Sequence, residues 1–136
     1  MGRWEERNHT ADLCIHVWGA DLEDLFATAA RGMFALITDL ESVPMTETEE
    51  LHLNAPDVEV LLVDWLNELL YLAEAGDPLT AYTAFTFERL STTALHAHAR
   101  GGPITDYHAY IKAATYHNLQ VRATQAGYET EIVFDT

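Results

Sequence analysis

Residues 13–26, LCIHVWGADLEDLF, contain a change from a strand pattern to a helix pattern. Up to Trp18 the chain alternates with a period of two, as a half-buried strand does, with its side chains divided between two faces. One face holds Leu13, Ile15 and Val17, and the other holds Asp12, Cys14, His16 and Trp18. After Gly19, Asp21 is placed to cap a helix, and Asp24 takes the acidic position three residues later. The stretch predicts a strand that leads directly into a helix.

Two helices are predicted. The first continues from Asp21 and ends in the polar segment 38–44. Its apolar residues recur at helical spacing: Leu22, Leu25, Phe26, Ala29, Met33, Leu36 and Ile37. The second is expected to begin near Asn54, with Pro56 in its first turn, and to end at Gly76 and Pro78. Its polar stripe contains only Asp57, Asp64, Asn67 and Glu68. Because this stripe is narrow, we expect the helix to be largely buried.

Period-two patterns predict further strands at 82–88, 95–100, 119–123 and 128–134. The last two flank Thr124 to Gly127, which has the character of a hairpin turn. A β-α-β-α order followed by a run of strands predicts an α+β fold, a two-layer sandwich with a mostly antiparallel sheet and two helices packed on one face. Because no repeat or long linker interrupts the sequence, residues 1–136 are expected to form one domain.

The chain is strongly acidic, with 22 Asp and Glu against 7 Lys and Arg, a formal net charge of −15. Such a surface repels phosphate backbones, so we expect no strong direct binding to nucleic acid. A basic protein partner, divalent cations, or solubility in an organism with an acidic proteome all remain open explanations. The lack of a long apolar run or secretory signal predicts a cytoplasmic protein that does not enter a membrane. The single cysteine, Cys14, has no partner for an internal disulfide and is expected to be buried.

Familiar catalytic motifs are absent from the sequence: it has no GK[ST] phosphate loop and no GxSxG elbow. His96 and His98 are two apart on a predicted strand, so both imidazoles can point the same way and hold zinc if a third ligand joins them. The solvated face of an edge strand is the commoner explanation for such a pair. Arg100, on the same face, would also repel a cation.

Oxygen ligands occur at three separate ends of predicted elements. The first strand is preceded by Thr10 and Asp12, with His9 beside them, and the first helix is followed by Asp39. The last strand ends with Asp135 and with Thr136, which carries the α-carboxylate. Oxygen ligands from separate elements suit a hard divalent cation such as calcium, magnesium or manganese. A turn held by side-chain hydrogen bonds is the alternative explanation for residues 8–12.

Several segments resemble the archease family. Residues 9–12 (HTAD), 18–19 (WG) and 21–26 (DLEDLF) resemble the opening signature of that family. Residues 33–39 (MFALITD) and 62–70 (LVDWLNELL) are similar to its two helices, residues 112–117 (KAATYH) to its Lys-Ala-x-Thr-Tyr-His motif, and residues 134–136 (FDT) to its ending. The matches fall in order along nearly the whole chain. Asn8 departs from the aspartate that is common at that position.

The resemblance implies an accessory protein rather than an enzyme. Archeases assist the RtcB-type RNA ligase in tRNA splicing and RNA repair by promoting its GTP-dependent guanylylation and multiple turnover. The family's metal-binding aspartates map onto Asp12 and Asp135, and less firmly Asp39, while Lys112, Tyr116 and His117 match a motif with a site-building or structural role. Two alternatives stay open. One is a chaperone or modulator of other RNA-modifying enzymes such as tRNA methyltransferases, and the other is a small metal-dependent hydrolase with His9 or His117 as base.

Overall fold

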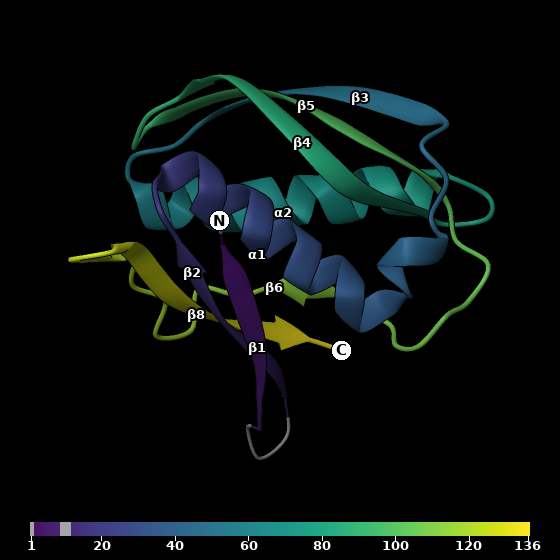
Figure 1. Ribbon diagram of the computed structural model, residues 1–136, viewed down its shortest axis with the longest axis horizontal. Helices are drawn as coiled ribbons and strands as arrows, with labels where there is room; N and C mark the ends of the chain where they lie inside the picture. The colour runs from purple at the N-terminus through teal and green to yellow at the C-terminus, as the bar shows by residue number, and fades with distance from the viewer. Residues whose placement is uncertain (1, 9–11) are drawn as a thin grey trace.

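The computed structural model describes residues 2–8 and 12–136, which form two antiparallel sheets with two helices between them (Figure 1). The first sheet contains β1 (Arg3–Asn8), β2 (Leu13–Gly19), β6 (Ala113–Ala114), β7 (Arg122–Thr124) and β8 (Gly127–Asp135). The second contains β3 (Glu47–Asn54), β4 (Thr80–Leu90) and β5 (Ala94–Pro103). The helices are α1 (Leu22–Ile37) and α2 (Val58–Ala75), and a 3-10 turn, η1 (Leu40–Ser42), follows α1. No helix in these ranges is long and apolar enough to cross a membrane.

The α+β class and the antiparallel pairing are confirmed, but the strands form two sheets rather than the one expected. The first sheet has the order β1-β2-β8-β6, with β7 also paired to β8, and the second has the order β3-β5-β4. The helices are therefore covered on both sides instead of lying on one face of one sheet (Figure 1). The reason is visible at Trp65 of α2, whose ring lies 5.5 Å from Phe85 and 5.4 Å from Phe87 of β4. Asn67, two residues along, faces β6 of the other sheet.

The start of α1 is as predicted. The Asp21 carboxylate accepts a hydrogen bond from the Asp24 N–H at 2.8 Å, and α1 ends before Thr38. The Asp24 carboxylate accepts from the N–H groups of Ala20 at 2.8 Å and Gly2 at 2.9 Å. Since Gly2 precedes β1, this cap also ties the beginning of the chain to the turn between β2 and α1.

The predicted start of α2 near Asn54 is wrong. Asn54 is the last residue of β3, and α2 begins at Val58 with Asp57 as its cap, accepting from the Val60 N–H at 2.9 Å. The strands β2, β4, β5 and β8 lie where the alternating patterns placed them. The strand expected at 119–123 is reduced to 122–124, because the Leu119 N–H closes a turn onto the Tyr116 carbonyl at 3.1 Å.

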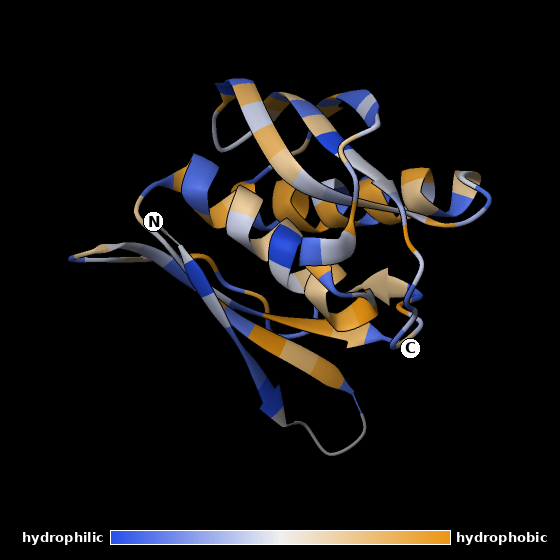
Figure 2. Cartoon of the chain, turned by 45° about the vertical axis from the view of Figure 1, so that its right-hand side comes forward, coloured by the Kyte–Doolittle hydropathy of each residue, from blue (hydrophilic) through white to orange (hydrophobic). Residues whose placement is uncertain are grey.

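A single hydrophobic cluster joins both helices to both sheets. It includes Ile15 and Val17 of β2, Leu51 of β3 and Ala97 of β5, all 3% exposed or less. Figure 2 shows apolar segments on both helices and on strands of both sheets. The outward faces of the sheets are consequently where polar side chains gather.

Candidate functional site

Asp12 and Asp135 lie at the ends of two neighbouring strands. β2 pairs with β8 in antiparallel register, and Leu13 is opposite Phe134. Asp12 directly precedes Leu13 and Asp135 directly follows Phe134, so the continued register sets the two aspartates opposite each other. Residues opposite each other in an antiparallel pair share a face of the sheet. Both aspartates and the following Thr136 are exposed to solvent.

The 112–117 motif lies along the same end of β8. The Lys112 N–H donates to the Asp135 carbonyl at 2.8 Å, and the Thr115 N–H donates to the Val133 carbonyl at 3.0 Å. Between them β6 pairs with β8, with Ala113 opposite Asp135. The backbone at Asp135 is therefore held on its β6 side, and the exposed Lys112 is adjacent to Asp135.

Asn67 of α2 fixes β6 from its other side. Its side-chain amide donates to the Ala114 carbonyl at 3.1 Å, and its amide oxygen accepts from the Ala114 N–H at 2.8 Å. The side chain thus replaces a neighbouring strand at the edge of the first sheet. In the sequence Asn67 belongs to the polar stripe of α2, and the signal that could have found it is that it is an amide between the carboxylates of Asp64 and Glu68.

Tyr116 extends toward α2, whereas His117 lies beside Asn118. The Tyr116 hydroxyl donates to the Asp64 carboxylate at 3.1 Å, and desolvation together with this hydrogen bond raises the pKa of Tyr116. The His117 ring is exposed and lies 3.4 Å from the Asn118 side-chain amide. Among the described residues, neither side chain forms a hydrogen bond or ion pair with Asp12 or Asp135. The histidine that a hydrolase would need beside the aspartates is not supplied by His117, and His9 lies outside the described residues.

Asp39 occupies a different setting from the aspartate pair. Its carboxylate caps η1 by accepting from the Glu41 N–H at 3.2 Å. It lines a surface pocket with Thr38, Asp106 and His108, and this pocket includes neither Asp12 nor Asp135. The His108 ring is 2.9 Å from the Asp106 carboxylate. The structure therefore gives Asp39 a local hydrogen-bonding role.

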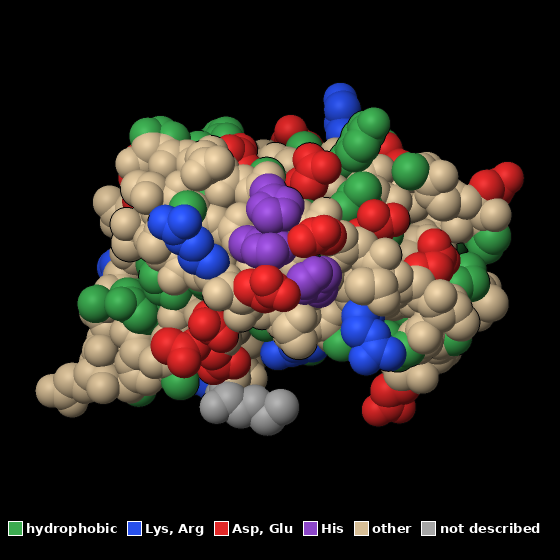
Figure 3. Space-filling model, turned by 90° about the horizontal axis from the view of Figure 1, so that it is seen from above, with side chains coloured by type: hydrophobic (Ala, Val, Ile, Leu, Met, Phe, Trp, Pro, Cys, Tyr) green, Lys and Arg blue, Asp and Glu red, His purple; other side chains and the backbone are tan. Residues whose placement is uncertain are grey.

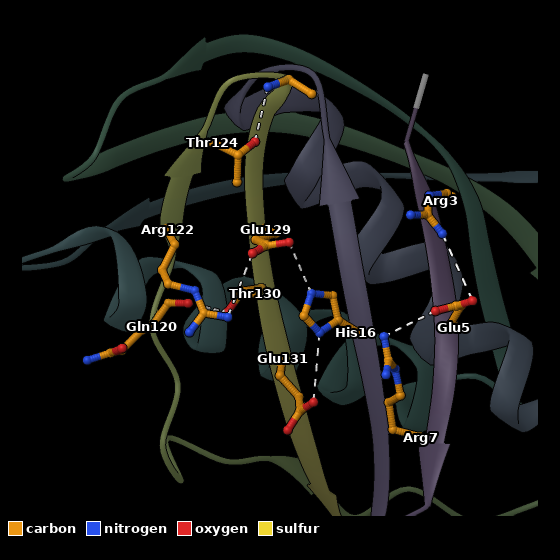
Figure 4. A network of polar contacts seen from close by, with 11 residues as sticks. Arg3, Glu5, Arg7, His16, Gln120, Arg122, Thr124, Glu129, Thr130 and Glu131 are labelled. Carbon is orange, nitrogen blue, oxygen red and sulfur yellow. Dashed lines mark hydrogen bonds and ion pairs between the residues drawn. The ribbon is translucent and has the colours of Figure 1, made fainter.

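The outward face of the first sheet carries a charged network next to the aspartate pair (Figure 4). His16 lies between two carboxylates, 3.4 Å from Glu129 and 3.8 Å from Glu131. The guanidinium group of Arg3 stacks 3.7 Å from the centre of the Trp18 ring. Asp12 and Asp135 continue this face, because they stand an even number of residues from His16 and Glu131.

Cys14 lies on that face but is fully buried, as predicted. Burial, together with the nearby Glu131 carboxylate, raises the pKa of the Cys14 thiol to about 12. A thiol that stays protonated is a poor nucleophile, so this cysteine is not a reactive group of the site.

The donor set at the strand ends fits a hard cation. Asp12 and Asp135 supply carboxylate oxygens, which calcium, magnesium and manganese prefer, and two carboxylates side by side would otherwise repel each other. Groups of three His, Cys, Asp or Glu side chains close enough to hold one ion occur within residues 2–8 and 12–136 only on the second sheet. A cation between Asp12 and Asp135 would therefore keep several water ligands.

These features define a small α+β protein in which two sheets enclose a helix pair and an exposed aspartate pair ends the first sheet. The model of the Archease protein family (MTH1598/TM1083) matches residues 4–136. The chain belongs to the archease family.

Relatives in sequence and structure agree with this assignment. The chain is 35% identical to the protein archease of Methanopyrus kandleri, over 97% of this chain and 98% of that protein. It is 36% identical to the protein archease of Saccharolobus islandicus, over 99% of each. The solution structure of Methanobacterium thermoautotrophicum protein 1598 superposes with a TM-score of 0.80, at 25% identity and 98% coverage of both chains. The Thermotoga maritima crystal structure of "an archease, possible chaperone" has the same fold, with a TM-score of 0.66, 23% identity and coverage of 97% of this chain and 96% of that one.

Proposed function

We propose that this chain is an accessory protein, not an enzyme, that activates an RtcB-type RNA ligase by promoting its GTP-dependent guanylylation and multiple turnover. In this proposal residues 1–136 form one cytoplasmic domain, and the activating site consists of Asp12, Asp135 and Thr136. Membership of the archease family supports it. The observation that carries it is the β2–β8 register, which sets the two exposed aspartates opposite each other.

Asp12 and Asp135 would hold a divalent cation, with Thr136 beside them and Asp39 as a weaker candidate. A cation so placed supplies charge stabilisation for a triphosphate. The contribution of the chain is to position its ligands. Lys112 and Asn67 fix the end of β8 through β6, so that Asp135 is oriented before any partner binds. The exposed side chains of Tyr116 and His117, which follow β6 in the chain, are the candidate contacts with the ligase.

The acidic surface supports docking to a basic partner. With a net charge of −15, the chain would be attracted to the basic rim that a ligase needs for RNA, and it would leave before RNA binds. Strong direct binding of the chain to nucleic acid is not part of the proposal. Because ions screen such attraction beyond a Debye length of about 10 Å at 0.1 M salt, association should weaken as the salt concentration rises.

The test is multiple-turnover RNA ligation by the cognate ligase with Asp12→Asn and Asp135→Asn variants. The expected result is stimulation by the natural chain and loss of stimulation with either variant, while their circular dichroism stays unchanged. Glu23→Gln is the matched control, because it removes an exposed carboxylate in the first turn of α1, beyond the other end of β2, and should keep full stimulation. Stimulation that survives in both Asp variants would remove the metal mechanism, and lack of stimulation by the natural chain would overturn the ligase role.

A chaperone function is the second candidate, and the words "possible chaperone" attached to the Thermotoga maritima relative favour it. A chaperone acting on other RNA-modifying enzymes, such as tRNA methyltransferases, would suppress their aggregation without added metal. Aggregation of a heated methyltransferase in the presence of the natural chain or Asp135→Asn separates the two functions. Equal protection by both would favour the chaperone.

A further inference from the structure

Five potential metal ligands lie on the outward face of the second sheet, whereas the aspartate pair belongs to the first sheet. Figure 3 shows histidine and acidic side chains side by side on this face. They come from all three strands: Glu50 and His52 of β3, Glu88 of β4, and His96 and His98 of β5. The expectation that His96 and His98 lie on an edge strand is wrong, because β5 is the central strand and receives ligands from both neighbours.

A β-bulge puts Glu88 among the histidines. Phe87 of β4 is opposite Ala97, whereas Arg89 is opposite His96, so Glu88 is an extra residue in the ladder. Phe87 packs inward against Trp65. Bulges commonly re-aim a side chain at a functional position. Here the extra residue sends the Glu88 carboxylate over the two imidazoles, with one oxygen 3.4 Å from His96 Nδ1 and the other 3.7 Å from His98 Nδ1.

These separations match a metal polyhedron. A tetrahedral ion with ligands at about 2.0–2.1 Å requires neighbouring ligand atoms to be about 3.3–3.4 Å apart. Glu88, His96 and His98 each offer one atom within 4.8 Å of the others, so small rotations close the set. The planes of the two imidazole rings are inclined by 49°, so the planes that contain their lone pairs intersect instead of running parallel.

Glu50 lies on the opposite side of the same rings. Its carboxylate is 2.6 Å from His96 Nε2, which is a hydrogen-bond distance and too short for two ligands of one ion. A carboxylate that accepts the Nε2 proton of a histidine makes its Nδ1 the free lone pair, and this is the usual support for a metal-binding imidazole.

His52 does not fit as a ligand together with His96. The two rings stack with centroids 3.9 Å apart and only 21° between their planes, so an ion close to the rings cannot lie in both planes, where the lone pairs lie. Arg100 is exposed on the same strand, but within the part of the chain that the structure describes it forms no ion pair with Glu50 or Glu88.

We propose that Glu88, His96 and His98 form a binding site for a zinc-class transition-metal ion, with Glu50 positioning His96. The mixed nitrogen and oxygen ligands select zinc, nickel or copper over the hard cations suited to the aspartate pair. The bound ion would join β4 to β5 across the bulge and leave one coordination position for water or a partner's side chain. The half-buried setting of His96 and His98, 24% and 31% exposed, gives it both support and access.

The test is titration of the untagged chain with zinc chloride by calorimetry, in an Asp12→Asn, Asp135→Asn background that removes the other candidate site. One equivalent of zinc should bind. Glu88→Gln and His98→Asn should abolish binding, and Glu50→Gln should weaken it about 10–100-fold, as loss of a supporting carboxylate does. His108→Asn, a histidine outside the second sheet that lies beside Asp106, should leave the affinity unchanged.

Nitrogen-15 spectra of the histidine rings add a second readout, which should show zinc on Nδ1 of His96 and His98. Three results would overturn the proposal: no zinc bound by the background protein, full affinity in Glu88→Gln, or coordination through Nε2. Circular dichroism of each variant separates loss of a ligand from loss of the fold.

Discussion

The hydrogen bonds from Asn67 to Ala114 predict a measurable loss of stability in Asn67→Leu. Leucine has the same branching of side-chain heavy atoms as asparagine and a higher helix propensity by about 0.5 kcal/mol, so helix formation alone would favour the variant. The substitution, however, leaves the N–H and the C=O of Ala114 without partners, and Ala114 is only 4% exposed. Each buried backbone group left unpaired costs about 1–3 kcal/mol.

Because Asn67 itself is only half-buried, water can reach part of this edge, and the expected net loss is about 2–4 kcal/mol. For a chain of this size that corresponds to a fall in Tm of roughly 8–16 °C. The assay is urea unfolding followed by circular dichroism, with the midpoint lowered and the slope unchanged. The control is Glu68→Leu, at the next position of α2, where the side chain makes no hydrogen bond within the described ranges. Equal stability of Asn67→Leu and the control would refute the role assigned to Asn67.

Three further substitutions or conditions give sharp expectations. Stability should fall as the pH rises from about 9 to about 12: burial raises the pKa of Cys14 from 9.0 and of Tyr82 from 10.0 to about 12, so the unfolded chain loses these protons first. Thermal unfolding at several pH values checks this, and the dependence should shrink in a Cys14→Ala, Tyr82→Phe variant. Trp65→Phe should lower the free energy of unfolding by about 2–4 kcal/mol, because it removes the 3.0 Å hydrogen bond from Nε1 to the Phe26 carbonyl and leaves a cavity. A decrease below about 1 kcal/mol in urea unfolding would contradict this expectation. Gly127→Ala should lower Tm, since Gly127 has φ +139° and a methyl group there would meet the Gly19 carbonyl; Ala126→Gly is the control at the adjacent, exposed position.

The elements predicted well from sequence are those whose signals are local. Asp21 and Asp24 mark the start of α1, and the hairpin at Gly127 follows from four adjacent residues. By contrast, β1 and β3 were not located, because their many charged residues obscure the alternation and they form by pairing with β2 and β5. The division into two sheets was missed for a related reason, since period-two patterns do not say which strands pair.

The candidate sites show the same dependence on distance along the chain. Asp12 and Asp135 each stood out at the end of a predicted strand, but only the register of β2 on β8 sets them opposite each other. His96 and His98 were noted as a possible pair, whereas Glu88 could not be added to them, because the bulge that presents it is a property of strand pairing. Asn67 carries no motif, and its role appears only when β6 lies beside α2.

The position of β8 sets the order in which a growing polypeptide can complete this fold. β8 pairs with β2, β6 and β7, all of which precede it in the chain. As the ribosome releases the chain, the β1–β2 hairpin and α1 emerge early, but Ile15 and Val17 of β2 lack the strand beside them until residues 127–135 have been made. The first sheet therefore closes in one late step, which pairs residues from opposite ends of the sequence. Nascent chains interrupted before that step would present an unpaired β2 edge, the kind of surface that promotes aggregation.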